Sequence, residues 1–311
     1  MAARATRSAT RRRGTRCHLI ELSHDELGVI VDGLADPLEP VIAVAFSSTC
    51  KGLRTPLRAA LELLQQRHAQ AARFCERVGW RWPVSDEELR GHGGCSYLRD
   101  VHELTLADWV EPLHMGDMET LAMILQTNGL PKLHALYLES NDFGDKDLAI
   151  LFGAMGPGAL PSLDDLPVFQ NKVGPLGVEA FAAALDRGAM PKLRKTAFYN
   201  NPIGNQGVSA LKASLRKREL WVLGLADTGL DDDGVSSLMS DLDKDDFKAL
   251  QNLDIGRNPM TDRSCAAITT ALNRGALPAL RKIFTEDAPG YKFSEEAGQA
   301  LHQAITTRIR L

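Results

Sequence analysis

The chain has 311 residues, of which 44% are apolar, 24% are charged and 6% are aromatic, and its formal net charge is -4 at pH 7. These proportions are ordinary for a globular protein and exclude wholesale disorder, which requires few apolar residues and a high net charge. The pI near 6.1 argues against a dedicated nucleic-acid-binding protein, because domains of that kind are basic. The length suits about two domains.

The sequence contains no stretch that could span a membrane. Its most apolar segment, residues 28–46, is interrupted by three acidic residues and two prolines, whereas a spanning helix needs about 20 largely uncharged residues. The five cysteines form no C-x-x-C pair, and no N-x-S/T sequon occurs, which favours a reducing compartment inside the cell. We therefore expect a cytoplasmic or nuclear protein that binds no metal or other cofactor.

The first 18 residues have a composition of their own. They contain six arginines and no acidic residue. They lack the apolar stretch of a secretory signal, so we expect a solvated, disordered tail. An organelle transit peptide or a nuclear-import signal is compatible with the same composition, and the sequence does not choose between these alternatives.

Residues 19–78 are predicted to form a small helical domain. Ser23 and Glu26 have the spacing of a capping box, and Leu22 and Leu27 have that of a hydrophobic staple, so a helix should begin after Ser23. Further helices are predicted over about 41–48 and from about 57 onward, because apolar residues recur there at helical spacing. Gly79 is placed to end the last of them.

The pattern L-S-x-D-E-L-x-x-I-x-x-x-L-x-D-P over residues 22–37, followed by Cys50-Lys51, resembles an F-box. F-boxes are short helical modules that dock on the Skp adaptor subunit of cullin-type ubiquitin ligases. The chain departs from the family pattern at Ser23, where a proline is usual, and at Leu53-Arg54, where an aromatic residue is common. A bundle that merely caps the next domain is the alternative interpretation. The resemblance implies an adaptor-binding set of Leu22, Leu27, Ile30, Leu34, Pro37 and Val41.

Internal repeats dominate the chain after a predicted linker at residues 79–102. The pattern Leu-x-x-Leu-x-Leu-x-x-Asn begins at Leu133 and returns with changes at intervals of 30 residues, at Leu163 and Leu193. A fourth copy follows after 27 residues and has Thr228 in the asparagine position, and a fifth begins at Leu250. Residues 106–125 fit a degenerate first unit, and the residues from 280 onward look like a terminal cap.

Each copy has closely spaced leucines before the asparagine and apolar residues at helical spacing after it, which predicts a strand, a turn and a helix. This arrangement is similar to the leucine-rich repeat family, and specifically to its ribonuclease-inhibitor-like class. The resemblance implies an α/β solenoid with a curved parallel sheet over residues 103–311, in which each unit buries its apolar face against its neighbours. A buried ladder of side chains should bond the backbone of the turns: Asn141, Asn171, Asn201 and Asn258.

Strand residues that alternate with the core leucines should face away from the helices. Three of them are aromatic, in a chain with few aromatic residues, and aromatic side chains anchor protein interfaces disproportionately. We therefore predict a partner-binding patch on this concave face. Its members are Tyr137, Glu139, Asp165, Phe169, Lys195 and Tyr199.

No residue pattern in the sequence indicates catalysis or a metal site, and the acidic runs at 231–233 and 241–246 are expected to be solvated loops. The favoured hypothesis is a non-catalytic adaptor, monomeric in isolation, that joins a Skp-type subunit of a ubiquitin ligase to an unidentified substrate protein. A leucine-rich-repeat scaffold without a ligase role is the alternative. A third possibility is an activator of Ran-type GTPases, because the same repeat class includes such proteins.

Overall fold

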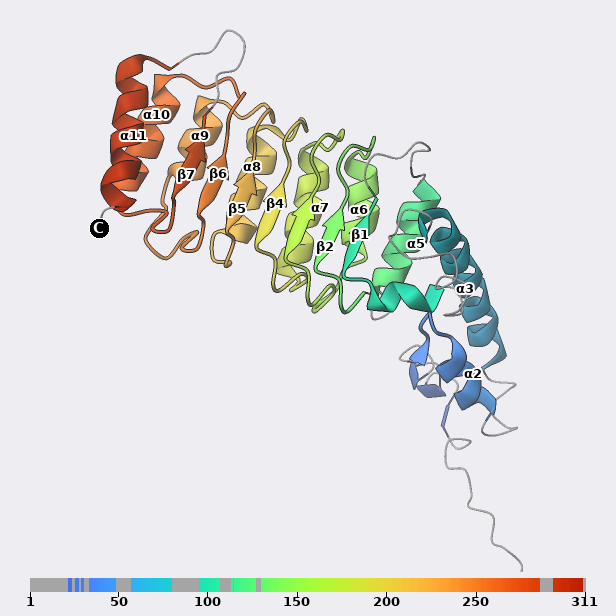
Figure 1. Cartoon of the computed structure of the whole chain (residues 1–311). Coiled ribbons are helices and arrows are strands. Elements are labelled where there is room, and N and C mark those ends of the chain that lie inside the picture. The colour runs from blue at the N-terminus through green and yellow to red at the C-terminus, as the bar shows by residue number, and fades with distance from the viewer. Residues whose placement is uncertain are drawn as a thin grey trace, which may run out of the picture.

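The computed structural model describes residues 22–23, 26–27, 29–30, 34–48, 57–79, 95–106, 113, 115–126, 130–285 and 293–309. The predicted tail at 1–18, the Cys50-Lys51 pair and most of the predicted linker lie outside this range. The described part of the chain forms an elongated stack with a smaller group of helices at its amino-terminal end (Figure 1). In the described helices, no stretch is both long and apolar enough to cross a membrane.

Strands and helices alternate along the stack. The strands are β1 Glu103–Thr105, β2 Ala135–Tyr137, β3 Asp165–Pro167, β4 Lys195–Ala197, β5 Val222–Gly224, β6 Asn252–Asp254 and β7 Lys282–Phe284. The helices are α5 Met115–Gln126, α6 Asp145–Gly153, α7 Pro175–Asp186, α8 Gly204–Leu215, α9 Asp232–Met239, α10 Asp262–Asn273 and α11 Glu295–Ile309.

The seven strands form one sheet in chain order, and every neighbouring pair is parallel. The helices form a second layer on one side of this sheet (Figure 1). Such an α/β solenoid of strand–turn–helix units is the leucine-rich-repeat fold that the periodicity predicts. The degenerate first unit supplies β1 and α5. The predicted terminal cap is itself a strand and a helix, since β7 pairs with β6 and α11 packs on α10.

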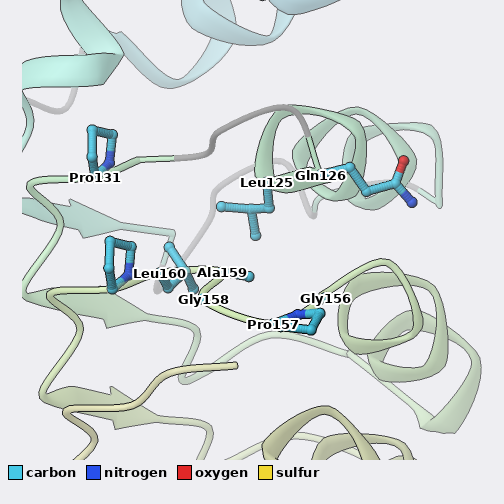
Figure 2. A pocket seen from close by; sticks show the side chains of 9 residues that line it. Leu125, Gln126, Pro131, Gly156, Pro157, Gly158, Ala159 and Leu160 are labelled. Atoms are coloured by element: carbon cyan, nitrogen blue, oxygen red, sulfur yellow. The ribbon is translucent and has the colours of Figure 1, made fainter. Parts of the chain in front are cut away.

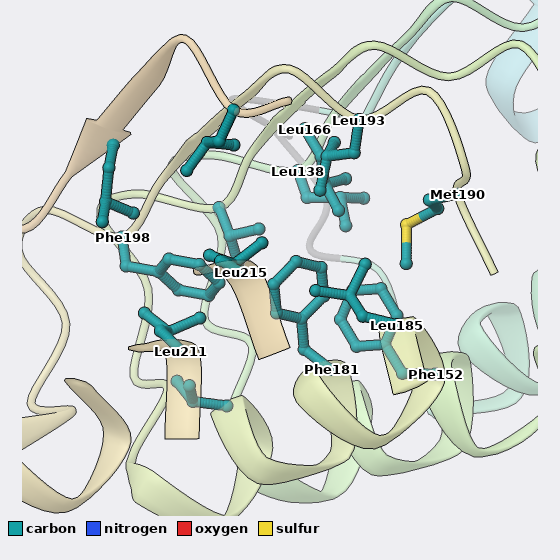
Figure 3. Packing of buried hydrophobic residues seen from close by; sticks show 14 of the residues in the cluster. Leu138, Phe152, Leu166, Phe181, Leu185, Met190, Leu193, Phe198, Leu211 and Leu215 are labelled. Atoms are coloured by element: carbon teal, nitrogen blue, oxygen red, sulfur yellow. The ribbon is translucent and has the colours of Figure 1, made fainter. Parts of the chain in front are cut away.

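The core lies between the two layers and runs the length of the stack. Leucines of the strands point toward the helices, and apolar residues of each helix point back, so nearly all of them are fully buried. Phe181 of α7 lies between Phe152 and Phe198, with ring centroids 5.1 and 5.5 Å apart (Figure 3). These three rings come from consecutive units, so each unit completes the core of the next.

The predicted asparagine ladder is present. Asn171 donates to the carbonyls of Leu138 and Val168, both at 2.9 Å, and its Oδ1 accepts the backbone N–H groups of Asn141 and Phe143. Asn141, Asn201 and Asn258 donate to backbone carbonyls in the same way. Buried backbone groups left without partners would cost about 1–3 kcal/mol each, so the ladder holds consecutive turns together.

Thr228 interrupts this ladder, as its shorter side chain predicts. Its hydroxyl donates to the carbonyl of Leu225 in its own unit at 2.8 Å and makes a longer contact of 3.4 Å with Asn258 Oδ1 of the next unit. The N–H of Ile203, which a longer side chain at this position could have accepted, bonds instead to the carbonyl of Asn201. Other side chains join this 27-residue unit to the previous one, since Asn205 donates to the Asp231 carboxylate at 2.7 Å and accepts the Asp231 N–H at 3.1 Å.

A second column of polar residues, four positions after the ladder, was not predicted. Asp145 accepts the N–H groups of Gly174 and Gly177 at 2.6 and 2.8 Å, and thereby caps the next helix from the previous unit. Asn205, Asp232 and Asp262 repeat the contact with the following turns. In the sequence, four of the five units have an Asp or Asn four positions after the ladder residue, and this recurrence could have indicated the column.

The acidic runs are not solvated loops throughout. Asp246 is fully buried and binds Arg216 through its Oδ1 at 2.8 Å and Lys217 at 2.8 Å. These bonds, chiefly that from Arg216, hold the pKa of Asp246 well below its usual range. Asp231 caps α9, and Asp232 accepts hydrogen bonds from Thr261 and Ser264. Spacing alone missed the roles of Asp232 and Asp246 because their partners lie one unit away in the stack.

The amino-terminal helices include α2 Val41–Ser48 and α3 Arg58–Gly79. The predicted capping box is formed, since Ser23 N–H donates to the Glu26 carboxylate at 2.8 Å and Glu26 N–H donates to the Ser23 hydroxyl at 3.2 Å. Helix α3 packs against α5, and its Phe74 and Val78 belong to the main core. Helix α3 therefore continues the hydrophobic core of the stack, while Leu27 with Leu57, and Ala43 with Leu64, form small clusters of their own.

The predicted linker also contributes to that core. It contains the short 3-10 helix η3, Cys95–Asp100, whose Leu98 is buried together with Val101. A bidentate ion pair between Arg77 of α3 and Asp117 of α5, at 2.9 and 2.8 Å, joins the helical part to the first repeat unit. Composition suggested a linker there because a short ordered turn and a linker are both rich in polar residues.

Candidate protein-binding surface

The face of the sheet that carries no helices, here called the open face, presents side chains in rows across the strands. Every second residue of a strand points to this face, and the parallel register aligns equivalent positions. The first row is Glu103, Ala135, Asp165, Lys195, Val222, Asn252 and Lys282. The second row is Thr105, Tyr137, Pro167, Ala197, Gly224, Asp254 and Phe284.

The backbone bonds beyond the strands continue the register into a third row. Ser140, Gln170 and Asn200 donate to carbonyls of the neighbouring unit at positions 169, 199 and 226. The third row is therefore Glu139, Phe169, Tyr199, Ala226 and Gly256.

The predicted patch lies on these rows, and its aromatic residues are not equivalent. Phe169 and Tyr199 are neighbours in the third row, with ring centroids 5.2 Å apart and tilted by 36°. Tyr137 lies in the second row, beside Pro167. Two of the three predicted rings therefore form a contacting pair, and the third is set diagonally from them. The pair is half-buried, as is Tyr137.

The floor beside these rings is made of small residues. Pro167, Ala197 and Gly224 are buried although they face away from the helices. The ring of Tyr199 lies over Gly224, where an added Cβ would be 2.1 Å from Tyr199 Cε1 and 2.9 Å from Ala197 Cβ. Gly224 therefore gives Tyr199 room to lie along the sheet toward β5. Gly224 is not a member of the predicted patch.

Carboxylates surround the rings. Burial raises the pKa of Tyr137, and the charges of Glu103, Asp165, Glu139 and Asp164 raise it further. Burial also raises the pKa of Tyr199, with added contributions from Asp254 and Asp165. Three of these acidic residues, at positions 103, 164 and 254, were missing from the predicted patch, because only the register brings them near the tyrosines.

A lysine lies beside these carboxylates. Lys195 donates to Asp165 at 3.4 Å. Burial raises the pKa of Asp165, and Lys195 opposes that shift. The neighbouring Arg194 places its guanidinium 4.4 Å above the ring of Trp221, on the side toward β5.

Glu139 is the least compensated group of the patch. Its Oε2 is shielded from water and accepts no hydrogen bond from any described residue. Burial raises the pKa of Glu139, its own backbone N–H opposes the shift, and Asp165 adds to it. A carboxylate held in this way favours a cation beside it, since opposite charge stabilises the ionised form.

The predicted adaptor-binding residues separate into buried and exposed groups. Leu27 is buried against Leu57 and Pro37 is buried, so neither can offer surface to a partner in this conformation. Val41 is 68% exposed. Leu22, Ile30 and Leu34 are half-buried.

Helix α2 presents apolar residues to solvent. Val41, Ile42 and Val44 are 68%, 52% and 46% exposed, while Ala43 and Ser47 on the other side of the helix are buried. Apolar side chains concentrated in this way mark contact sites more often than isolated ones do. We call Val41, Ile42 and Val44 the α2 face.

A pocket of about 200 Å³ lies between consecutive helix-to-strand turns, lined by residues that include Leu125, Pro131, Pro157 and Leu160 (Figure 2). Its lining carries no titratable side chain, so it offers no acid–base or metal chemistry. Within the described ranges, no group of three histidine, cysteine or acidic residues is arranged to hold a metal ion.

No protein-family model and no curated protein matches the chain. Among solved structures, the chain is similar to the crystal structure of the leucine-rich repeat domain of APL1B, at 16% identity and a TM-score of 0.33. The match covers 58% of this chain and 45% of that one. Because so distant a likeness carries no functional information, the function must be inferred from the surfaces of this chain.

Proposed function

We propose that the protein is a non-catalytic adaptor that binds a partner protein on its open face. The observation that supports this most is the patch itself. Five carboxylates and three aromatic rings from several repeat units converge on this face. Half-buried aromatic residues beside a rim of charge are typical of interface hot spots.

The proposal can be tested by comparing the proteins that the full chain captures with those captured by a variant. The triple substitution Tyr137→Ala, Phe169→Ala and Tyr199→Ala should abolish capture of the partner, because truncation of a hot-spot residue costs about 2 kcal/mol or more, which is about a thirtyfold loss of affinity. Leu176→Ala on helix α7, also an exposed apolar residue, is the matched control. Unchanged capture by a folded triple variant would disprove binding at this face.

A more specific form of the proposal concerns the α2 face. The F-box-like pattern of residues 22–37 and three exposed apolar side chains on α2 favour docking on a Skp-type adaptor subunit, which would make the protein a substrate receptor of a cullin-type ubiquitin ligase. The 30-residue period and the full helix in each unit are in keeping with the ribonuclease-inhibitor-like class of repeats. Receptors that join an F-box-like module to such repeats would have this layout.

Purified Skp-type adaptor subunit and the full chain provide the test. Binding should be lost when Val41→Glu and Val44→Glu are combined, because both side chains are exposed and charge would be buried in the complex. Leu63→Glu, on the exposed side of α3, is the control. Leu27 is unsuitable for this test because its truncation would create a cavity in the helical core. Absence of binding by the unmodified chain would leave a repeat scaffold with no ligase role.

A further inference from the structure

We infer that the surface where strands β4 to β7 begin binds an acidic segment of the partner protein through Arg194, Arg281 and Lys282. This inference rests on the proposed function and specifies the chemistry of the partner. Three features of the surface support it: the distribution of charge along the sheet, the hydrogen-bond donors that point to solvent, and the stacking of Arg194 on Trp221.

The backbone places these residues side by side. The N–H groups of Arg194, Trp221, Gln251 and Arg281 donate to the carbonyls of the equivalent residues one unit earlier, at 2.7 to 2.9 Å. These positions form a row that immediately precedes the first row of the open face, and we call it the leading row. Lys282 follows Arg281 and is the last member of the first row.

The leading and first rows divide by charge along the stack. Near β1 to β3 they contain the acidic residues Glu103, Asp164 and Asp165. From β4 to β7 they contain no acidic residue, because Asp254 of β6 lies in the second row. An acidic segment is therefore attracted to the β4–β7 end and repelled from the β1–β3 end. The cations of the β4–β7 end are Arg194, Lys195, Arg281 and Lys282.

Three of these cations are available to a ligand. Lys195 is paired with Asp165, whereas Arg194, Arg281 and Lys282 are exposed. Within the part of the chain that the structure describes, the side chains of these three residues make no hydrogen bond and no ion pair. Guanidinium and ammonium groups form charge-assisted hydrogen bonds with carboxylates, which are stronger than bonds between neutral groups.

Arg194 is held in a defined position. Its guanidinium carbon lies 4.4 Å from the centroid of the half-buried Trp221 ring. Stacking uses the face of the guanidinium and leaves the N–H groups on its edge able to make two parallel bonds to a carboxylate. A side chain that is already ordered loses less conformational freedom on binding. Arg194 is therefore the expected anchor for an acidic side chain.

The separation of the cations indicates which acidic pattern fits. Neighbouring strands lie about 4.8 Å apart, so the starts of β4 and β7 are separated by about 14 Å. An extended peptide advances about 3.3 Å per residue. Acidic side chains about four residues apart, in a segment that crosses the strands, would therefore reach Arg194 and Arg281 together.

Fluorescence anisotropy of the full chain with a labelled peptide of repeated Glu-Gly-Ser-Gly tests the inference. We expect saturable binding, weakened about tenfold when Arg281→Gln and Lys282→Gln are combined and about fivefold by Arg194→Gln, because each substitution removes a charge-assisted contact. Repeated Gln-Gly-Ser-Gly should not bind.

The matched control combines Arg73→Gln and Lys146→Gln. Both side chains are exposed, lie on α3 and α6 and form no ion pair among the described residues. This variant changes the net charge by the same amount as the double substitution on β7. Its binding of the acidic peptide should equal that of the unmodified chain.

Tryptophan fluorescence provides a second readout that locates the ligand. A carboxylate bound to Arg194 changes the charge beside the Trp221 ring, so the peptide should alter the emission of Trp221. Trp221→Phe should keep the affinity within about twofold, because phenylalanine also stacks with cations, but should lose the change in emission. A change that persists in Trp221→Phe would place the peptide beside another tryptophan.

Several outcomes would overturn the inference. Unchanged binding by the double variant on β7, shown to be folded by thermal melting, would place the peptide elsewhere. Binding that disappears when the six arginines of residues 1–18 are replaced by glutamine would place it on that segment. A single-stranded oligonucleotide that displaces the peptide and binds more tightly would make the ligand a nucleic acid.

The inference and the proposed function fail in distinguishable ways. Absence of acidic-peptide binding, in a protein whose triple aromatic variant still loses its partner, would disprove the acidic ligand and leave the proposed function intact. Capture of the same partner by the triple aromatic variant would instead disprove the proposed function at its source.

Discussion

Helices α7 and α2 are both rich in apolar residues, but these residues are buried in α7 and exposed in α2. In α7, Val178, Phe181 and Leu185 are buried completely, because α6 and α8 flank the helix on both sides. In α2, Val41, Ile42 and Val44 remain exposed. A helix inside a stack finds partners in its neighbours, while one at the end of the stack must leave an apolar face open or bind another molecule.

The difference separates residues that maintain the stack from residues available for binding. Apolar periodicity alone does not distinguish these two classes, since both helices show it. Whether an apolar face is buried depends on whether a neighbouring unit packs against it. Substitutions in the interior of the stack should therefore affect stability, and those on α2 or the open face should affect binding.

The largest effect on stability is expected from Phe181→Ala. This ring contacts Phe152 and Phe198 of the flanking units, so its loss leaves a cavity shared by three repeats. We expect the free energy of unfolding to fall by about 4 kcal/mol, measured by urea denaturation. A loss below about 1 kcal/mol would mean that the units do not depend on each other for their core.

Substitution in the asparagine ladder should give the next largest loss of stability. Asn171→Ala removes bonds to two carbonyls and two backbone N–H groups in a buried setting, which we expect to cost about 3 kcal/mol. Thr228→Ala removes one donated bond and should cost about 1 kcal/mol. Equal losses in the two urea titrations would contradict the conclusion that the ladder is interrupted at the fourth unit.

A small gain in stability is expected from Glu139→Gln at neutral pH. The folded state raises the pKa of this carboxyl, so the charged form is disfavoured on folding and stability falls as pH rises through that pKa. The variant should be more stable by about half a kcal/mol at pH 7, and the gain should vanish below the ordinary pKa near 4.5. A gain that persists in acid would have another cause.

The smallest effect on stability is expected from Val41→Ser combined with Val44→Ser. Both side chains are largely exposed, and exposed substitutions usually change stability by less than about 0.5 kcal/mol. Thermal melting of the full chain measures the effect. A loss of several kcal/mol would show that α2 is packed against the remainder of the chain and is not a free face.

The site was predictable from sequence only in part. Alternation along the strands placed Tyr137, Phe169 and Tyr199 on one face, because the side-chain period of a strand is two. It did not show that Tyr137 belongs to a different row, nor that Gly224 makes room for Tyr199, because both depend on the register between strands. Leu27 was assigned to a docking surface for a similar reason, since a core leucine and a docking leucine share the same helical spacing.

The sequence by itself determined the repeat. Leucines two and three residues apart, an asparagine after them and a helical pattern that follows dictate a strand, a turn and a helix, and their return every 27 to 30 residues dictates stacking. Tertiary structure alone decided which polar groups meet. Asp246 finds Arg216 and Lys217, and the carboxylates of β1, β3 and β6 act on two tyrosines, across distances of about 30 residues or more in the chain. Local patterns encode bonds within a unit, whereas charge pairing between units depends on the register that the stacked core imposes.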